Sequence, residues 1–115
     1  MRYLRERTGA GRLRIRIELG GLRTAGEFRR RVREACDVPG HLGPGADALD
    51  EAMRELGWLG EREVELCCTG LERLAARDVE LHALVIETLS EWRRFWRQRP
   101  ERPRDVRPQS VHLRF

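Results

Sequence analysis

Residues 13–19, Leu-Arg-Ile-Arg-Ile-Glu-Leu, alternate strictly between apolar and charged side chains. In an extended chain successive side chains point to opposite faces, so this period of two puts the apolar residues on one face and the charged residues on the other. The stretch therefore predicts a β-strand with one buried face, which ends at Gly20-Gly21. Residues 63–68 and 111–115 alternate in the same way, and we predict strands there as well.

Segments with helical spacing separate these strands. Thr24 followed by Glu27 forms the pattern of a capping box, which predicts a helix from there to about Cys36. Apolar spacing predicts further helices over residues 46–56, over residues 71–76, and from about residue 79 until Pro100 ends the last one. Strands that are joined through helices usually lie parallel in one sheet. The sequence therefore predicts an α/β fold with a small three-stranded, mainly parallel sheet flanked by helices.

The length of 115 residues fits one domain with one modest core. We expect residues 1–12, which are charged and contain glycine, to be a flexible basic leader. Residues 13–115 then form the single domain. Within it, residues 98–109 are expected to be a basic, proline-rich linker before the last strand.

Charge is distributed unevenly along the chain. The formal net charge is +4, but residues 1–44 carry 11 Arg and 5 Asp or Glu, residues 45–91 carry 4 Arg and 12 Asp or Glu, and residues 92–115 carry 8 Arg and 2 Asp or Glu. An acidic middle segment thus lies between two basic ends. The net charge alone would indicate a nucleic-acid partner, whereas the segments allow a basic partner as well.

Signals for catalysis, cofactors and membranes are weak. The three histidines lie far apart, and the sequence has no HExxH or GxSxG motif and no Cys/His cluster with metal-ligand spacing. Cys36 and His41 could form a nucleophile and base, but nothing in the sequence orients them. The glycines of residues 40–45 follow a helix and precede acidic residues, unlike a phosphate-binding loop. We predict no enzymatic activity, no metal, no cofactor and no small-molecule substrate.

Apolar runs, the first residues and the cysteines indicate where in the cell the protein is expected. No run of 18 apolar residues is present, and the first residues lack the apolar core of a secretory signal. Cys36, Cys67 and Cys68 form neither an even set nor a CxxC pair. We therefore expect a protein of the reducing cytoplasm without a membrane anchor.

The basic carboxyl-terminal part allows two interpretations. Residues 92–99 interleave aromatic residues with arginine, which is typical of surfaces that stack on bases and bind phosphate. Trp92, Phe95 and Trp96 are also spaced as a core-facing helical stripe, and this pattern favours burial over nucleic-acid binding. Nucleic-acid binding through Arg93–Arg107 stays as the alternative function, with nucleic acid an unlikely partner.

The helix over residues 46–56 begins with acidic residues directly after a rigid Gly/Pro-rich loop. Asp47 and Glu51 are four residues apart, so they lie on one helix face, where like charges repel slightly. One interpretation is ordinary: carboxylates in a first turn favour the positive end of the helix dipole, and Asp50 can pair with Arg54. The other is that the acidic residues bind a basic partner.

The loop and helix resemble the barstar family, whose members inhibit a secreted ribonuclease inside the cell. Members carry a proline, an aromatic pair, a glycine, an asparagine two residues later, then Asp-Ala-Leu and an acidic residue. The residues of this chain in that register are Pro39, His41-Leu42, Gly43, Gly45, Asp47-Ala48-Leu49 and Glu51. The order of elements agrees over about residues 13–115, and the residue identity is concentrated in residues 38–50. The resemblance implies a small three-stranded parallel sheet with helices around it.

The resemblance also implies a function and a site. The chain would bind a ribonuclease, or a related basic toxin, and occlude its active site with an acidic loop and helix. Asp47 and Glu51 take the two acidic helix positions of the family, and Glu91 takes a third on the long helix. His41 and Gly43 take loop positions that pack against the target.

The chain departs from the family pattern at the neighbouring positions. His41-Leu42 replaces the aromatic pair, Gly45 replaces the asparagine and Asp50 replaces a tryptophan. The loss of aromatic anchors predicts weaker binding or another target. A barstar-like domain with a different protein partner is therefore a further alternative.

Overall fold

The computed structural model describes residues 2–9 and 11–115. Four strands form one sheet in the order β1-β2-β3-β4. Their bounds are Tyr3–Arg7 for β1, Arg12–Glu18 for β2, Glu63–Thr69 for β3 and Ser110–Arg114 for β4. Strands β2, β3 and β4 are parallel, with Ile15, Leu66 and Leu113 in register across them, and β1 is antiparallel to β2. The predicted mainly parallel sheet is confirmed, with one strand more than expected.

The additional strand corrects the prediction of a flexible leader. Tyr3 pairs with Ile17 and Arg7 pairs with Leu13, so β1 and β2 form a hairpin. Gly9 and Gly11 both have a positive φ in the connecting turn, a conformation that glycine adopts without strain. Apolar alternation does not predict β1, because β1 is a short edge strand. Its residue Tyr3 packs only partly against the core. Residues 1 and 10 of the predicted leader lie outside the described residues.

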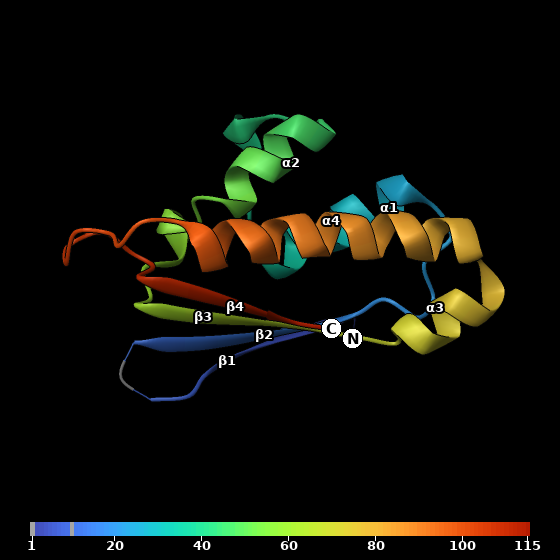
Figure 1. The fold of residues 1–115 in the computed structure, drawn as a ribbon, viewed down its shortest axis with the longest axis horizontal. Helices are drawn as coiled ribbons and strands as arrows, with labels where there is room; N and C mark the ends of the chain where they lie inside the picture. The colour runs from blue at the N-terminus through green and yellow to red at the C-terminus, as the bar shows by residue number, and fades with distance from the viewer. Residues whose placement is uncertain (1, 10) are drawn as a thin grey trace.

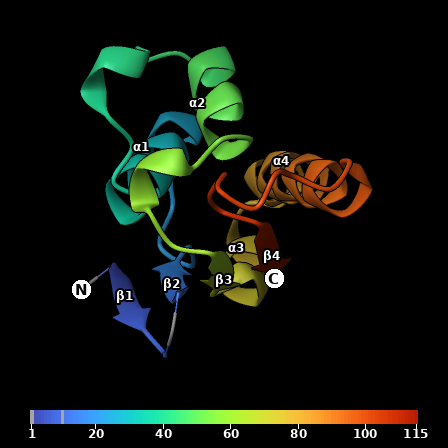
Figure 2. The same cartoon turned by 90° about the vertical axis from the view of Figure 1, so that its left-hand side faces the viewer.

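Helices cover one face of the sheet, and a further helix lies at one end of it (Figures 1 and 2). They are α1 (Ala25–Ala35), α2 (Ala46–Met53), α3 (Leu71–Arg77) and α4 (Val79–Gln98), with short 3₁₀ helices η1 (Gly40–Leu42) and η2 (Gly57–Leu59). Helix α4 runs along the sheet, α2 lies above it and α3 lies at one end (Figure 1). The alternating apolar residues of β2, β3 and β4 are buried beneath this layer, as the period of two predicts.

The aromatic residues near the end of α4 belong mainly to the core. Trp92 and Trp96 are 1% and 7% exposed, and they continue the buried stripe of Leu81, Val85 and Leu89 along α4. The core-facing interpretation of residues 92–96 is therefore correct, and the two tryptophans cannot stack on a bound base. No helix in residues 2–9 and 11–115 is long and apolar enough to cross a membrane.

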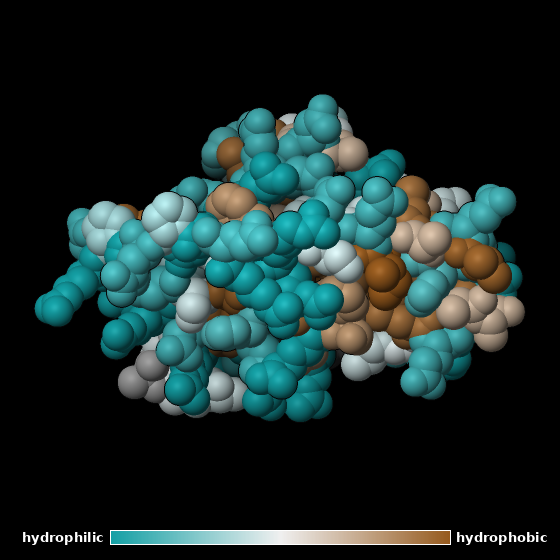
Figure 3. Space-filling model, viewed as in Figure 1, coloured by the Kyte–Doolittle hydropathy of each residue, from teal (hydrophilic) through white to brown (hydrophobic). Residues whose placement is uncertain are grey.

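The sheet face opposite α4 carries charged side chains that pair across the strands. Arg12 and Arg14 of β2 lie 3.0 and 3.3 Å from Glu63 and Glu65 of β3, and Arg114 of β4 also reaches Glu65, at 3.5 Å. Arg12 and Arg14 therefore each have a carboxylate partner within the sheet. The surface in Figure 3 is mostly hydrophilic, with an apolar area at the end where α3 meets α4.

Candidate protein-binding site

The loop before α2 has a defined conformation. Pro39 is followed by η1, and Gly43 has a φ of 94° and a ψ of 163°, which only glycine adopts readily. Arg33 of α1 donates from Nη1 to the carbonyl of Gly43 at 2.6 Å and from Nη2 to the carbonyl of Gly45 at 2.7 Å. One guanidinium group therefore fixes both ends of the Gly43–Gly45 turn to α1.

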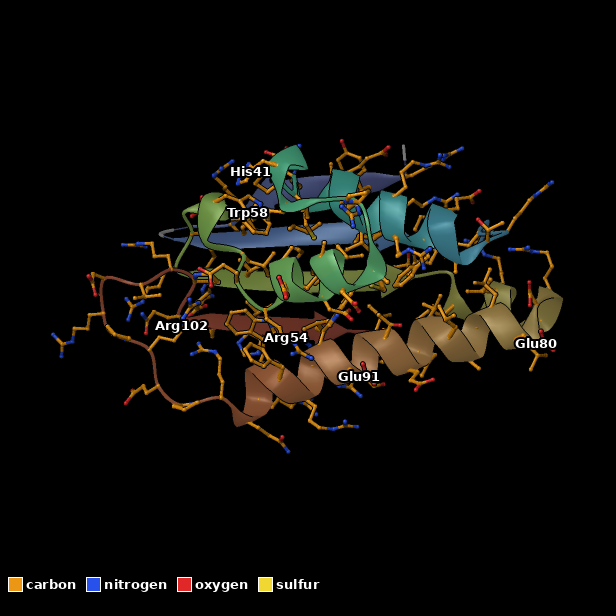
Figure 4. All side chains as sticks on the ribbon, turned by 90° about the horizontal axis from the view of Figure 1, so that it is seen from above. His41, Arg54, Trp58, Glu80, Glu91 and Arg102 are labelled. Atoms are coloured by element: carbon orange, nitrogen blue, oxygen red, sulfur yellow. The ribbon has the colours of Figure 1, made fainter. Side chains whose placement is uncertain are left out.

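A second contact supports the base of this loop. Trp58 of η2 donates from Nε1 to the carbonyl of Cys36 at 2.9 Å, and the Val38 amide donates to the carbonyl of Arg33 at 2.9 Å. His41 is exposed above Trp58 (Figure 4). Leu42 is 39% exposed, one of few large apolar side chains at the surface. The loop thus presents one imidazole and one apolar side chain from a fixed backbone.

Helix α2 buries one side and exposes the other. Leu49, Ala52 and Met53 are buried against the core, whereas Asp47 and Glu51 are exposed. Asp47 lies in the first turn, where the helix dipole favours a negative charge. Among the described residues, no Arg, Lys or His nitrogen lies within 4 Å of either carboxylate. The chain's own arginines therefore leave both groups available.

Asp50 has a different environment from the other two acidic residues. It is half-buried, and its Oδ1 accepts a hydrogen bond from Nε1 of Trp92 on α4 at 2.9 Å. The alternative in which Asp50 pairs with Arg54 is not what the structure has: Arg54 lies over the ring of Phe95, 5.3 Å from its centroid. Asp50 therefore connects α2 to α4.

A second indole group fixes the other end of α2. Trp96 donates from Nε1 to the carbonyl of Met53 at 2.8 Å, in a buried hydrogen bond. Together with the Trp92–Asp50 bond, this contact attaches α2 to α4 at two points. The orientation of Asp47 and Glu51 is thus set by the core and not by the helix alone.

Glu91 extends the acidic surface to α4. It is exposed, and the described residues provide it with no ion pair. Figure 4 looks down on the helical layer and shows α2 between His41 and Glu91. We call Asp47, Glu51 and Glu91 the acidic surface.

A small cleft of about 160 Å³ is lined by Ala46 and Asp50, the sequence neighbours of Asp47 and Glu51, and also by Arg29. Residues of α1, α2 and α4 line it, including Leu49, Asp50, Leu84 and Trp92. Leu84 is 40% exposed. Charged groups next to an apolar cleft are typical of a protein-binding surface.

The Cys36–His41 pair does not have the properties of a nucleophile and its base. Cys36 is 1% exposed, and burial raises the pKa of its thiol to about 12. A catalytic thiol requires the opposite change in pKa. In the part of the chain that the structure describes, no group of three or more His, Cys, Asp and Glu side chains could hold a metal ion.

The fold and the site together define a small α/β protein that carries a rigid loop and an exposed acidic helix face. A family model described as Barstar (barnase inhibitor) matches residues 13–106. The chain belongs to the barstar family, as the sequence resemblance indicated. No curated protein and no solved structure matches it. The family match covers most of the chain, including the loop and α2, but not β1 or β4.

Proposed function

We propose that this protein binds a ribonuclease, or a related basic toxin, and blocks its active site with residues 40–45 and α2. The proposal rests on the exposure of Asp47 and Glu51 and on their lack of ion pairs in the described residues. Both are exposed on one face of α2, and neither has an ion pair among the described residues. They directly follow a loop whose backbone Arg33 holds in place.

The chemistry of the target supports this assignment. A ribonuclease must hold RNA phosphates, so its active site carries positive charge. Carboxylates at fixed positions can replace those phosphates and form paired hydrogen bonds with arginine. Because the loop and α2 are already ordered, little conformational entropy is lost on binding.

The residues have distinct roles in the proposal. Asp47 and Glu51 make the main contacts with basic groups, and Glu91 makes a third. His41 packs against the target, while Gly43 and Gly45 let the loop backbone approach closely. Asp50 acts indirectly, because its bond to Trp92 orients α2.

Two further statements belong to the proposal. The protein acts by occlusion and is not itself an enzyme. It works in the cytoplasm, where Cys36, Cys67 and Cys68, all free thiols in the structure, would stay reduced.

A binding and inhibition experiment tests the proposal. The chain is immobilised, incubated with barnase and, separately, with an extract of the native organism, and ribonuclease activity is measured in the retained fraction and in solution. We expect a retained ribonuclease whose activity the free chain inhibits. Asp47→Asn with Glu51→Gln should weaken this inhibition by a factor on the order of 100 or more, as removal of one partner of a close charge pair does in the barnase–barstar complex.

A matched control separates the acidic surface from net charge. Glu72→Gln with Glu80→Gln removes the same charge from exposed positions on α3 and α4, where the described residues provide no ion pair. We expect this control to inhibit like the wild type, apart from a small change in association rate. Equal inhibition by both double variants would remove Asp47 and Glu51 from the mechanism.

A further inference from the structure

Three arginines from two separate segments line one hollow. Arg62 lies directly before β3, and Arg104 and Arg107 lie in the loop between α4 and β4. With Gln109 they form a hollow of about 370 Å³, which we call the arginine hollow. No carboxylate of the described residues lies within 4 Å of these three guanidinium groups.

The loop that carries Arg104 and Arg107 is held by many hydrogen bonds. The Gln109 amide donates to the carbonyl of Arg62 at 2.7 Å, and Gln109 Nε2 donates to the carbonyls of Pro103 and Val106, each at 2.6 Å. Arg102 donates to the carbonyl of Pro108 at 2.8 Å. The loop extends from one end of the long axis of the molecule (Figure 1). It presents its arginines from a defined backbone and not from a loose linker.

The turn between β1 and β2 lies beside Arg62 and Arg107. A Cβ atom placed on Gly11 would lie 3.0 Å from Cβ of Arg62 and 4.0 Å from Nη1 of Arg107. Both side chains therefore pack beside the same glycine. Positive groups that line one hollow repel each other, and a bound anion would offset that repulsion.

Three acidic residues near the hollow have arginine partners of their own. Glu61 lies 2.6 Å from Arg7, Glu63 lies 3.0 Å from Arg12, and Glu55 lies 3.7 Å from Arg102. Glu101 and Asp105 are exposed in the same loop but do not line the hollow. Among the described residues, none of these carboxylates forms an ion pair with Arg62, Arg104 or Arg107.

We infer that the arginine hollow is a second binding site, which takes phosphate groups of a nucleic-acid backbone. The guanidinium fork fits phosphate oxygens and stays charged at every physiological pH. Only Arg and Gln side chains line the hollow, so it lacks the apolar anchor that a protein interface needs. Because Trp92 and Trp96 are buried, binding would rest on phosphate contacts and would not depend on base sequence.

The test is fluorescence anisotropy of a labelled single-stranded RNA with the whole chain at two salt concentrations. Three phosphate contacts predict a fall in affinity of about 20-fold between about 50 and 200 mM salt. Arg62→Gln, Arg104→Gln and Arg107→Gln combined should lower the affinity at low salt and remove about 2 from the slope of log K against log salt. Absence of RNA binding by the wild type at low salt would overturn the inference.

A charge-matched control distinguishes the site from general positive charge. Arg16→Gln, Arg23→Gln and Arg30→Gln remove the same charge from exposed side chains that, in the described part of the chain, make no ion pair or hydrogen bond. We expect the control to keep the salt slope of the wild type to within the error of the fit. Equal losses in both triple variants would show that the hollow has no special role. Thermal unfolding confirms that each variant is folded.

Two more measurements complete the design. Polyglutamate of similar charge should bind much more weakly than RNA, and equal binding would contradict the choice of a nucleic acid. The Asp47→Asn, Glu51→Gln variant should bind RNA at least as well as the wild type. Absence of RNA binding would therefore leave the proposed inhibition standing. Absence of inhibition would likewise leave the proposed RNA binding standing.

Discussion

Replacement of Arg33 by methionine should loosen the loop before α2 while the rest of the fold remains. Methionine keeps the length and much of the apolar stem but has no donor. The variant therefore loses the hydrogen bonds to the carbonyls of Gly43 and Gly45, at 2.6 and 2.7 Å. The perturbation addresses the property on which the proposed inhibition depends, namely that the loop is ordered before it meets its target.

The expected cost follows from the two bonds. A hydrogen bond from a charged donor contributes about 1.5–3 kcal/mol net, so two of them give an upper limit of about 3–6 kcal/mol. Gly45 is exposed and Gly43 is half-buried, so water can replace part of what is lost. We therefore expect a fall in the free energy of unfolding of about 1–3 kcal/mol, which corresponds to a shift of about 1 M in the urea midpoint.

Two measurements check this expectation. Urea unfolding gives the change in stability, and hydrogen exchange reports the loop through the amides of Gly43 and Leu49, which donate to the carbonyls of Gly40 and Gly45. Arg33→Lys should recover at most half of the loss, because one ammonium group does not reproduce a planar fork. Arg30→Met, an exposed position on the same helix, should stay within about 0.5 kcal/mol of the wild type.

Agreement of Arg33→Met with Arg30→Met in both urea midpoint and exchange rates would show that the Arg33 hydrogen bonds do not order the loop. A loss of stability without faster exchange in the loop would also contradict this role of Arg33, since the cost would then arise elsewhere. Once a target is known, Arg33→Met should weaken its binding although Asp47 and Glu51 are unchanged. The loop of the variant is less ordered before binding, so it loses more conformational entropy when it binds.

Three other predictions concern the contacts that support the site and the sheet. Trp92→Phe removes the donor to Asp50 and should lower the free energy of unfolding by about 1–3 kcal/mol. A double-mutant cycle of Trp92→Phe and Asp50→Ala, measured by urea unfolding, should give a coupling free energy of at least about 0.5 kcal/mol. Gly70→Ala should cost more than about 2 kcal/mol in the same assay, because Gly70 has a φ of 80° and the added Cβ would lie 2.6 Å from the Gly20 nitrogen. Burial acts to raise the pKa of Glu18, but hydrogen bonds from the Gly20 amide and Thr69 and the charge of Arg73 outweigh it and hold the pKa below its usual value. The stability that this carboxylate contributes is present above the unfolded-state pKa of about 4.3 and is lost as the pH falls through the lower folded-state pKa, so Glu18→Gln should reduce the acid sensitivity of the urea midpoint in that range.

The parts of the fold that sequence periodicity describes were predictable. The strands β2, β3 and β4 alternate because one face lies on the core, and the buried stripe of α4 follows the helical period. Thr24 does cap α1 and accepts from the Glu27 amide at 3.0 Å. The Glu27 side chain does not complete the capping box, since it accepts instead from Arg31 at 3.0 Å. The local pattern gave the helix start correctly and the partner of one side chain wrongly.

The contacts that define the site were not predictable, because they join residues far apart in sequence. Asp50 has Arg54 four residues away, yet its partner is Trp92 on another helix. Arg33 donates to backbone carbonyl groups. Every residue has such a group, so the sequence does not indicate which ones accept from Arg33. Arg62 meets Arg107 only because β3 and β4 are neighbours in the sheet. Strand β1 was missed because an edge strand needs little apolar surface.

The positions of the arginines explain how a chain of net charge +4 can present an acidic surface. Some guanidinium groups are used inside the fold: Arg77 donates to the carbonyls of Gly20 and Leu22, and Arg33 donates to the carbonyls of Gly43 and Gly45 in the loop. An arginine that donates to carbonyl oxygens neutralises no carboxylate. The local field at α2 therefore depends on Asp47 and Glu51 and on the distance to other charges, since potentials between exposed groups decay over about 8–10 Å at physiological salt. The arginine hollow and the acidic surface consist of different residues on different elements, so they can act on different partners and the net charge does not determine what either surface binds.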